Sequence, residues 1–109
     1  KPQAGRGTPG PSNAPRVLTG RQVAYLRQPK PVYPAFSRRA GETGKVILRV
    51  LIDKKGRPTE IKIEKSSGFP RLDDAAVAAA RGSLFSPNIE NGEPREAYGI
   101  VPIVFELEN

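Results

Sequence analysis

The stretch KVILRVLIDKKGRPTEIKIEK, residues 45–65, decides the fold. Its first half alternates, so one face of an extended chain carries Val46, Leu48, Val50 and Ile52, and the other face is mixed. Residues 53–58 have the composition of a turn, in which Gly56 supplies the positive φ that closes a hairpin. Ile61 and Ile63 then alternate with charged residues, so residues 59–65 are predicted to return as the second strand.

The flanking segments predict two helices and a last strand. Residues 70–81 form the clearest helix, with a face of small residues made by Leu72, Ala75, Ala76, Ala79 and Ala80. Residues 96–108 form a strand in which Val101, Ile103, Phe105 and Leu107 share a face. Upstream, Pro34 is predicted to be the first residue of a short helix over 34–40, with Phe36 and Ala40 facing the core.

This order predicts an α+β two-layer sandwich, with two helices packed on one face of a small three-stranded antiparallel sheet. The helical crossover places the last strand beside the first strand of the hairpin, on an edge of the sheet. Pro102 agrees with that position, because proline inside a strand is confined to edges, strand starts and bulges. An apolar edge strand of this kind is suited to accepting a strand from a partner.

The 109 residues are predicted to form one domain and a tail. Residues 1–16 form a flexible, disordered Pro/Gly-rich basic linker, and residues 17–28 form a connecting segment with a possible short strand near residues 22–27. The folded domain is predicted over residues 29–109. Six basic and no acidic residues lie in residues 1–30, whereas residues 31–109 carry twelve basic and eleven acidic residues. Residues 1–30 therefore carry +6 of the net charge of +7, the folded part is nearly neutral, and no nucleic-acid partner is predicted.

Composition also argues against catalysis. The chain has no cysteine and no histidine, so neither a Cys–His nor a Ser–His–Asp system can form, and we expect no enzyme activity, no cofactor and no metal. Ser66 and Ser67 are predicted to end a strand, and Asp73 to complement the helix dipole. Two apolar runs of six residues, 75–80 and 100–105, are too short to span a membrane. The chain begins with Lys1, so we expect a fragment of a longer protein.

Seven short motifs in register resemble the TonB C-terminal domain family over about residues 29–109. They are Pro31-x-Tyr33-Pro34, Gly44-x-Val46, Asp53-x-x-Gly56-Arg57, Ser66-Ser67-Gly68, Leu72-Asp73-x-Ala75-Ala76, Phe85-x-Pro87 and Asn91-Gly92. Two positions depart from the pattern. Lys30 stands where some relatives have Gln, with Gln28 two residues earlier, and Ser83-Leu84 stands where many have Trp.

The resemblance implies a periplasmic domain of a protein anchored in the inner membrane of a Gram-negative bacterium. Such domains couple the ExbB–ExbD complex, through the missing N-terminal part, to outer-membrane TonB-dependent receptors that import siderophores, haem or cobalamin. The receptor's TonB box adds as a strand alongside the last strand, and the segment before the Tyr-Pro motif also touches the receptor. The partner-binding residues implied here are Gln28, Lys30, Pro31, Val32, Tyr33, Pro34, Tyr98, Ile100, Val101, Ile103, Val104 and Phe105.

Two alternatives stay open at this point. The edge strand could pair with its own copy, or with a strand at residues 23–27, giving a self-associating structural domain. A TolA-like envelope adaptor would work by similar mechanics. We expect a monomer, with an edge-strand dimer as the alternative.

Overall fold

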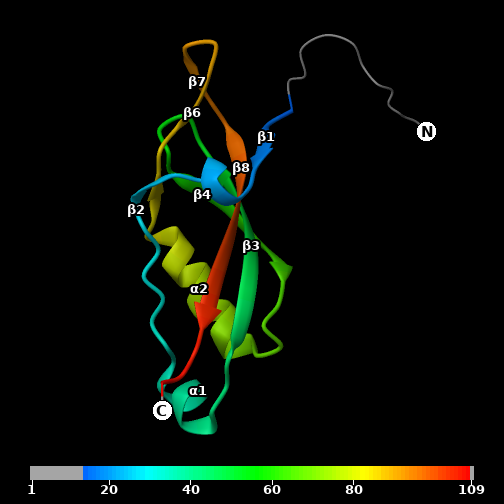
Figure 1. The fold of residues 1–109 in the computed structure, drawn as a ribbon, viewed down its shortest axis with the longest axis vertical. Helices are drawn as coiled ribbons and strands as arrows, with labels where there is room; N and C mark the ends of the chain where they lie inside the picture. The colour runs from blue at the N-terminus through cyan, green and yellow to red at the C-terminus, as the bar shows by residue number, and fades with distance from the viewer. Residues whose placement is uncertain (1–13, 109) are drawn as a thin grey trace, which may run out of the picture.

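The computed structural model describes residues 14–108. Most of the linker expected at residues 1–16, namely residues 1–13, lies outside this range. The elements follow one another as shown in Figure 1: β1 (Arg16–Leu18), the 3₁₀ helix η1 (Gly20–Gln22), β2 (Tyr25–Arg27), α1 (Ala35–Ala40), β3 (Gly44–Ile52), β4 (Pro58–Lys65), α2 (Pro70–Arg81), β5 (Leu84–Phe85), β6 (Asn88–Glu90), β7 (Glu93–Arg95) and β8 (Ala97–Phe105).

The main sheet confirms the predicted α+β class and strand order and adds one strand. β4, β3 and β8 are antiparallel neighbours in that order, as the hairpin and the helical crossover predict. The fourth strand is β1, which pairs with β8 in parallel, with Arg16 opposite Ala97 and Leu18 opposite Gly99. The expected three-stranded sheet is therefore corrected to four strands. Three residues are too few for alternation to be visible in a sequence.

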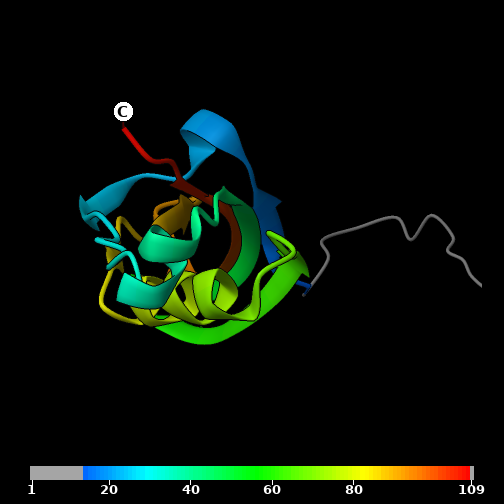
Figure 2. The same cartoon turned by 90° about the horizontal axis from the view of Figure 1, so that it is seen from below.

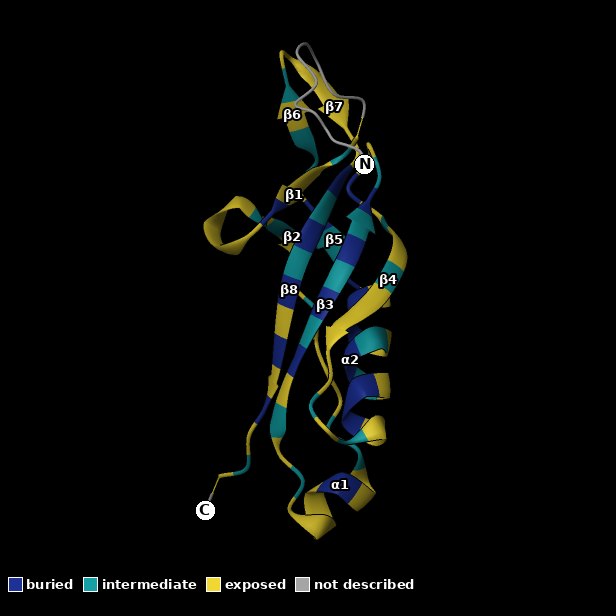
Figure 3. Ribbon diagram, turned by 90° about the vertical axis from the view of Figure 1, so that its right-hand side faces the viewer, coloured by how far each residue is buried: buried dark blue, intermediate teal, exposed yellow. Residues whose placement is uncertain are grey.

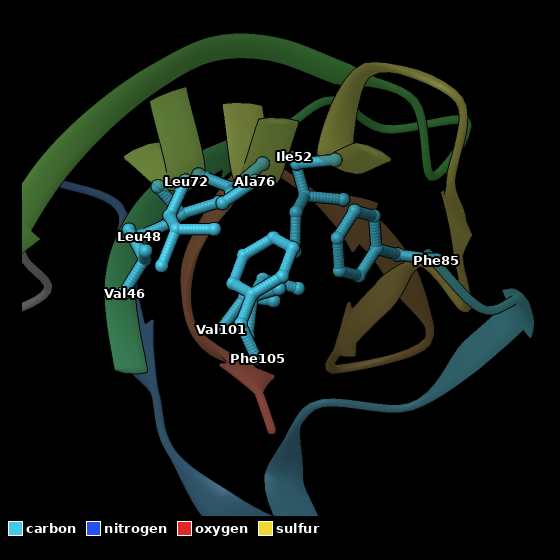
Figure 4. Packing of buried hydrophobic residues seen from close by; sticks show 11 residues of the cluster. Val46, Leu48, Ile52, Leu72, Ala76, Phe85, Val101 and Phe105 are labelled. Carbon is cyan, nitrogen blue, oxygen red and sulfur yellow. The ribbon is translucent and has the colours of Figure 1, made fainter. Parts of the chain in front are cut away.

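One face of this sheet holds the core. The even-numbered residues of β3 from Val46 to Ile52 and the odd-numbered residues of β8 are buried, and Figure 3 shows this alternation with α2 along the same side of the sheet. The view along the molecule in Figure 2 shows β3 and β8 curving over α2. Small side chains let α2 lie close to the sheet, so the core in Figure 4 is built from Val46, Leu48, Ile52, Leu72, Ala76, Phe85, Val101 and Phe105 with their neighbours.

The short helix α1 differs from its prediction in two respects. Pro34 is the N-cap residue, with φ −61° and ψ 137°, and the helix begins at Ala35. Phe36 is 48% exposed and Ala40 is exposed, whereas Ser37 is the buried residue of the helix. The Phe36 ring instead lies 3.9 Å from the Arg71 guanidinium, which covers part of its surface.

The β3–β4 turn is hydrogen-bonded to the rest of the domain. An Asp53 carboxylate oxygen accepts hydrogen bonds from the N–H groups of Lys55 and Arg57, at 2.9 and 2.8 Å. These bonds, the Arg57 N–H first among them, lower the pKa of Asp53 although partial burial opposes them. Gly56 has φ +85°, and its carbonyl accepts a 2.8 Å hydrogen bond from the Phe85 N–H. The turn thereby joins the hairpin to β5.

The Ser-Ser-Gly turn holds a buried carboxylate. Asp73 is only 8% exposed, and it accepts hydrogen bonds from the hydroxyls of Ser66 and Ser67, at 2.5 and 2.7 Å, and from the Ser67 N–H at 2.9 Å. Burial alone would raise the pKa of Asp73, but these three donors outweigh it and the pKa is lowered. The turn after β4 and the first turn of α2 are therefore joined through one side chain.

Replacing Asp73 tests this junction. Asp73→Asn should lower the free energy of unfolding at pH 7 by about 1–3 kcal/mol, because the donors lose a charged acceptor. Since the folded pKa lies below the ordinary value of about 3.9, the stabilisation is complete above about pH 4 and is lost as pH falls through the folded pKa. Urea unfolding at several pH values measures both effects. Asp74→Asn is the matched control, because Asp74 is the next residue of α2 and is exposed. Equal losses in the two variants would contradict the assignment.

Replacing Gly56 tests the docking of the hairpin turn. A Cβ at this position would lie 1.9 Å from the Phe85 carbonyl oxygen, so Gly56→Ala should cost more than about 2 kcal/mol of stability. Gly92→Ala is the control, because Gly92 has a similar φ of +81° but no heavy atom within 4 Å of the added carbon. It should cost about 1–2 kcal/mol from backbone strain alone. Equal losses in thermal melts would show that the turn is not held against β5.

Candidate functional site

The outer edge of β8 is covered over only part of its length. β3 pairs with β8 on one side from Ala97 to Phe105. On the other side β1 pairs with Ala97, Tyr98 and Gly99, and no strand of the described residues pairs with residues 100–105. A half-open edge of six residues remains, as Figure 1 shows for the lower half of β8.

Pro102 determines which backbone groups this edge presents. It lies opposite Ile47 of β3 and has no N–H to donate. A proline fits the middle of a paired strand only where its nitrogen points away from the neighbour. The N–H groups of Ile100 and Val104 share its direction and face the open edge, together with the carbonyls of all three residues. The edge therefore offers two donors and three acceptors.

The expected site residues on β8 divide into two sets. Val101, Ile103 and Phe105 are at most 4% exposed, and their side chains belong to the core. Tyr98 and Ile100 are half-buried on the opposite face, and Val104 is 51% exposed there. The Arg49 guanidinium lies 4.5 Å from the centre of the Tyr98 ring. The first set holds β8 in place. Of the second set, Ile100 and Val104 lie on the surface beside the open edge, whereas Tyr98 lies where β1 covers the edge, opposite Val17.

A groove of about 530 Å³ follows the open edge. One side is the edge itself with its neighbour in β3, and the other is the chain segment that precedes α1. The lining residues are Gly20, Val23, Tyr25, Gln28, Pro29, Pro31, Ile47, Ile100, Pro102, Ile103 and Val104. None of these carries a charge, so the groove is apolar apart from a few backbone groups, the Gln28 amide and the Tyr25 hydroxyl.

The wall of the groove is fastened to the domain at several points. Leu18 is 6% exposed, and the Tyr25 ring packs against Phe85 with 5.1 Å between ring centres. Burial raises the pKa of the Tyr25 hydroxyl. The Ser86 N–H donates to the Ala24 carbonyl at 2.8 Å, and the Arg27 side chain donates to the Gly82 carbonyl at 2.9 Å. The segment before residue 29 is therefore packed on the domain.

The residues expected in the segment 28–34 lie in different surroundings. Gln28 and Pro31 line the groove, whereas Lys30 lies beside Ala78 and Ala79 of α2. Val32 is 77% exposed. The Tyr33 ring packs edge-on against Phe105 and its hydroxyl donates to the Glu42 carbonyl, so this residue anchors the end of the segment. Pro34 caps α1.

Sequence reasoning missed Val23, Tyr25 and Pro29 as residues of the groove. The only signal was the weak alternation of residues 23–27, which predicts a strand without naming its partner. That strand, β2, pairs with β5 and not with β8. The alternative in which residues 23–27 cover the edge of β8 is therefore wrong, and β1 holds that position over residues 97–99.

Within residues 14–108, no group of three or more Asp and Glu side chains is placed to hold a metal ion. In the same range, neither α-helix has the length and apolarity needed to cross a membrane.

The sequence matches a family model and several characterised proteins. Residues 29–107 match the model of the Gram-negative bacterial TonB protein C-terminal. The tonB2 protein of Pseudomonas aeruginosa is 41% identical over 85 residues, which is 78% of this chain and 32% of that protein. The TonB protein of Neisseria gonorrhoeae is 47% identical over 79 residues, 72% of this chain and 26% of that protein. The chain thus spans about a third or less of the length of these relatives.

Solved structures share the fold, and the family match completes the assignment. The solution structure of the Pseudomonas aeruginosa TonB C-terminal domain has a TM-score of 0.68 at 24% identity, over 85% of this chain and 94% of that one. The tonb2 protein of Vibrio anguillarum has a TM-score of 0.61 at 22% identity, over 100% and 99%. These likenesses show the fold, and the matched residues 29–107 show the family. The chain belongs to the family of Gram-negative TonB C-terminal domains.

Proposed function

We propose that this domain binds the TonB box of outer-membrane TonB-dependent receptors by β-strand addition to the open edge of β8. In this role it transmits proton-motive-force energy for the import of siderophores, haem or cobalamin. Membership of the TonB family supports an energy-transducing role with receptors, carried out by an interaction domain and not by an enzyme. The half-open edge of β8 is the observation that carries the proposed mode of binding.

The edge suits a weak, reversible contact. Two donors and three acceptors allow at most five backbone hydrogen bonds, each with a net contribution of about 0.5–1.5 kcal/mol. Ordering a flexible segment takes back about 2–5 kcal/mol. The isolated box should therefore bind weakly, and an intact receptor more tightly through further contacts. Gln28 and Pro31 line the groove beside the edge and are placed to contact the added strand.

β1 supports the proposal from within the chain. It already lies on the same edge as a parallel strand, with Leu18 opposite Gly99. An incoming strand has two ways to bind: it can stop at Ile100, or it can displace the three residues of β1 and use the whole of β8. Residues 100–105 are free in both cases, so the first contact is expected there.

The remaining parts of the proposal follow from the family. The domain would lie in the periplasm as part of a protein anchored in the inner membrane, and ExbB and ExbD would act through the part of such a protein outside this chain. The TonB match favours this role over a TolA-like adaptor. Self-pairing of two copies through the same edge is the competing use of residues 100–105.

A titration followed by amide NMR tests strand addition. A synthetic TonB-box peptide should shift the amides of residues 100–105 other than Pro102 and that of Gln28, with smaller shifts at residues 97–99, while light scattering reports a monomer. Absence of shifts at millimolar peptide, together with a dimer mass that rises with concentration, would replace strand addition by self-pairing.

A substitution at Val104 tests the backbone register. Val104→Pro removes one of the two outward donors without removing a hydrogen bond to β3, because the Val104 N–H faces the open edge. Peptide affinity should fall by about threefold to tenfold, the effect of one hydrogen bond. Val104→Thr keeps the donor and should bind as the unchanged domain does. An equal loss in both variants would contradict the register, since only the side chain would then matter.

A further inference from the structure

We infer that the segment 20–31, which forms the outer wall of the groove, selects the strands that bind to β8. The strand it fits carries aliphatic side chains at alternate positions, and Val23 and Tyr25 set the size and chemistry of those side chains. This inference rests on the proposed strand addition, because it assigns the partner's side chains once a strand lies on the edge.

The part of the β8 edge that β1 occupies shows how the side chains of an added strand alternate between the two faces of the sheet. In β1, Val17 lies opposite Tyr98 and is 41% exposed, whereas Leu18 lies opposite Gly99 and is 6% exposed. Leu18 points to the side of the sheet that holds the core, as neighbouring side chains in register share a face. A strand added further along β8 would alternate in the same way, with every second side chain directed to the core side.

On that side the added strand meets the groove wall. A Cβ on Gly99, which would point to the core side, would lie 3.7 Å from both methyl carbons of Val23. Tyr25 is stacked on the buried Phe85, so it lies on the same side of β8. Figure 1 shows the chain after β2 running alongside β8, and Pro29 and Pro31 continue the wall there.

The chemistry of the wall determines which side chains of a partner strand fit into the groove. The groove residues in the described chain are uncharged, so an ionised side chain directed into the groove would lose hydration without finding a counter-ion. Aliphatic side chains would bury apolar surface against valine, tyrosine and proline. Side chains on the other face of the added strand would lie beside Ile100 and Val104, at the solvent-exposed margin of the groove where Val104 is 51% exposed, so charge is tolerated there. The pattern that fits is therefore aliphatic at every second position.

Part of the wall lies outside the residues that match the family model. The family match begins at residue 29, so Val23 and Tyr25 lie before it. Two domains with the same sheet and different preceding segments would then present the same hydrogen-bonding edge with different walls. Differences between such domains in the strands they select would then come from residues 20–28, whereas the backbone hydrogen bonds of β8 would be common to all of them.

Two uncharged peptides with the same amino-acid composition but a different residue order test the preference for aliphatic side chains at alternate positions. Val-Thr-Val-Thr-Val-Thr places three valines on one face, and Val-Val-Val-Thr-Thr-Thr places at most two there. The 109-residue chain should bind the alternating peptide about tenfold more tightly, the effect of one additional buried valine. Isothermal titration measures the ratio, and amide shifts at residues 100–105 confirm the site.

A substitution at Val23 tests whether this residue determines which peptide side chains the groove binds. Val23→Ala enlarges the groove, so the affinity for Phe-Thr-Phe-Thr-Phe-Thr relative to the alternating valine peptide should rise about tenfold. Leu26→Ala is the matched control, because Leu26 lies in the same segment, is 68% exposed and does not line the groove. The ratio should not change in that variant. A gain in relative affinity cannot arise from misfolding.

The outcomes separate this inference from the proposed function. If both valine peptides shift residues 100–105 with equal affinity and Val23→Ala leaves the ratio unchanged, the edge binds strands but the wall does not select, and the inference is overturned. If neither these peptides nor a TonB-box peptide shifts the edge, strand addition itself fails and the inference fails with it. A change of ratio in Leu26→Ala equal to that in Val23→Ala would also overturn it.

Discussion

The register of β8 against β3 is set by one residue that has no backbone N–H group. Pro102 has no N–H and lies opposite Ile47, so its position must face away from β3. The alternation that follows puts Val101, Ile103 and Phe105 into the core and turns the free N–H groups of Ile100 and Val104 outward. A shift of one residue would expose the core side chains and place the proline where β3 needs a donor. Packing and edge geometry therefore enforce the same register.

The N-terminal segment then decides how much of that edge is usable. It covers residues 97–99 through β1, crosses the edge at η1 and continues as the wall of the groove. Tyr25, Arg27 and the Ala24 carbonyl fasten it to the segment 82–86. The Phe85 N–H of that segment in turn donates a hydrogen bond to the Gly56 carbonyl of the β3–β4 turn. A break at either junction would loosen the wall while leaving the sheet intact. The open edge is therefore a product of the whole fold, although only β8 would bind the partner.

Sequence patterns could predict the elements with strong periodicity. The hairpin over residues 45–65 and the helix over 70–81 follow from alternation and turn chemistry, and the structure confirms them. The predicted edge position of the last strand holds only for residues 100–105, because β1 pairs with residues 97–99. The features that sequence patterns did not predict depend on tertiary contacts. The pairing of β1 depends on one buried leucine, and the burial of Ser37 in place of Phe36 depends on how a six-residue helix meets the sheet. Val23 and Tyr25 could not be assigned to the groove, because nothing in a short uneven segment indicates which surface it will cover.

Amide hydrogen exchange on the free domain tests the half-open edge most directly. The Tyr98 amide, which faces β1, should be protected, whereas the amides of Ile100 and Val104 on the same edge should exchange rapidly. The Val101 and Ile103 amides, which face β3, should be protected throughout. Protection of Ile100 and Val104 equal to that of Tyr98 would mean that the edge is already occupied. A partner strand would then have to displace whatever covers it, and the groove would not be an open site.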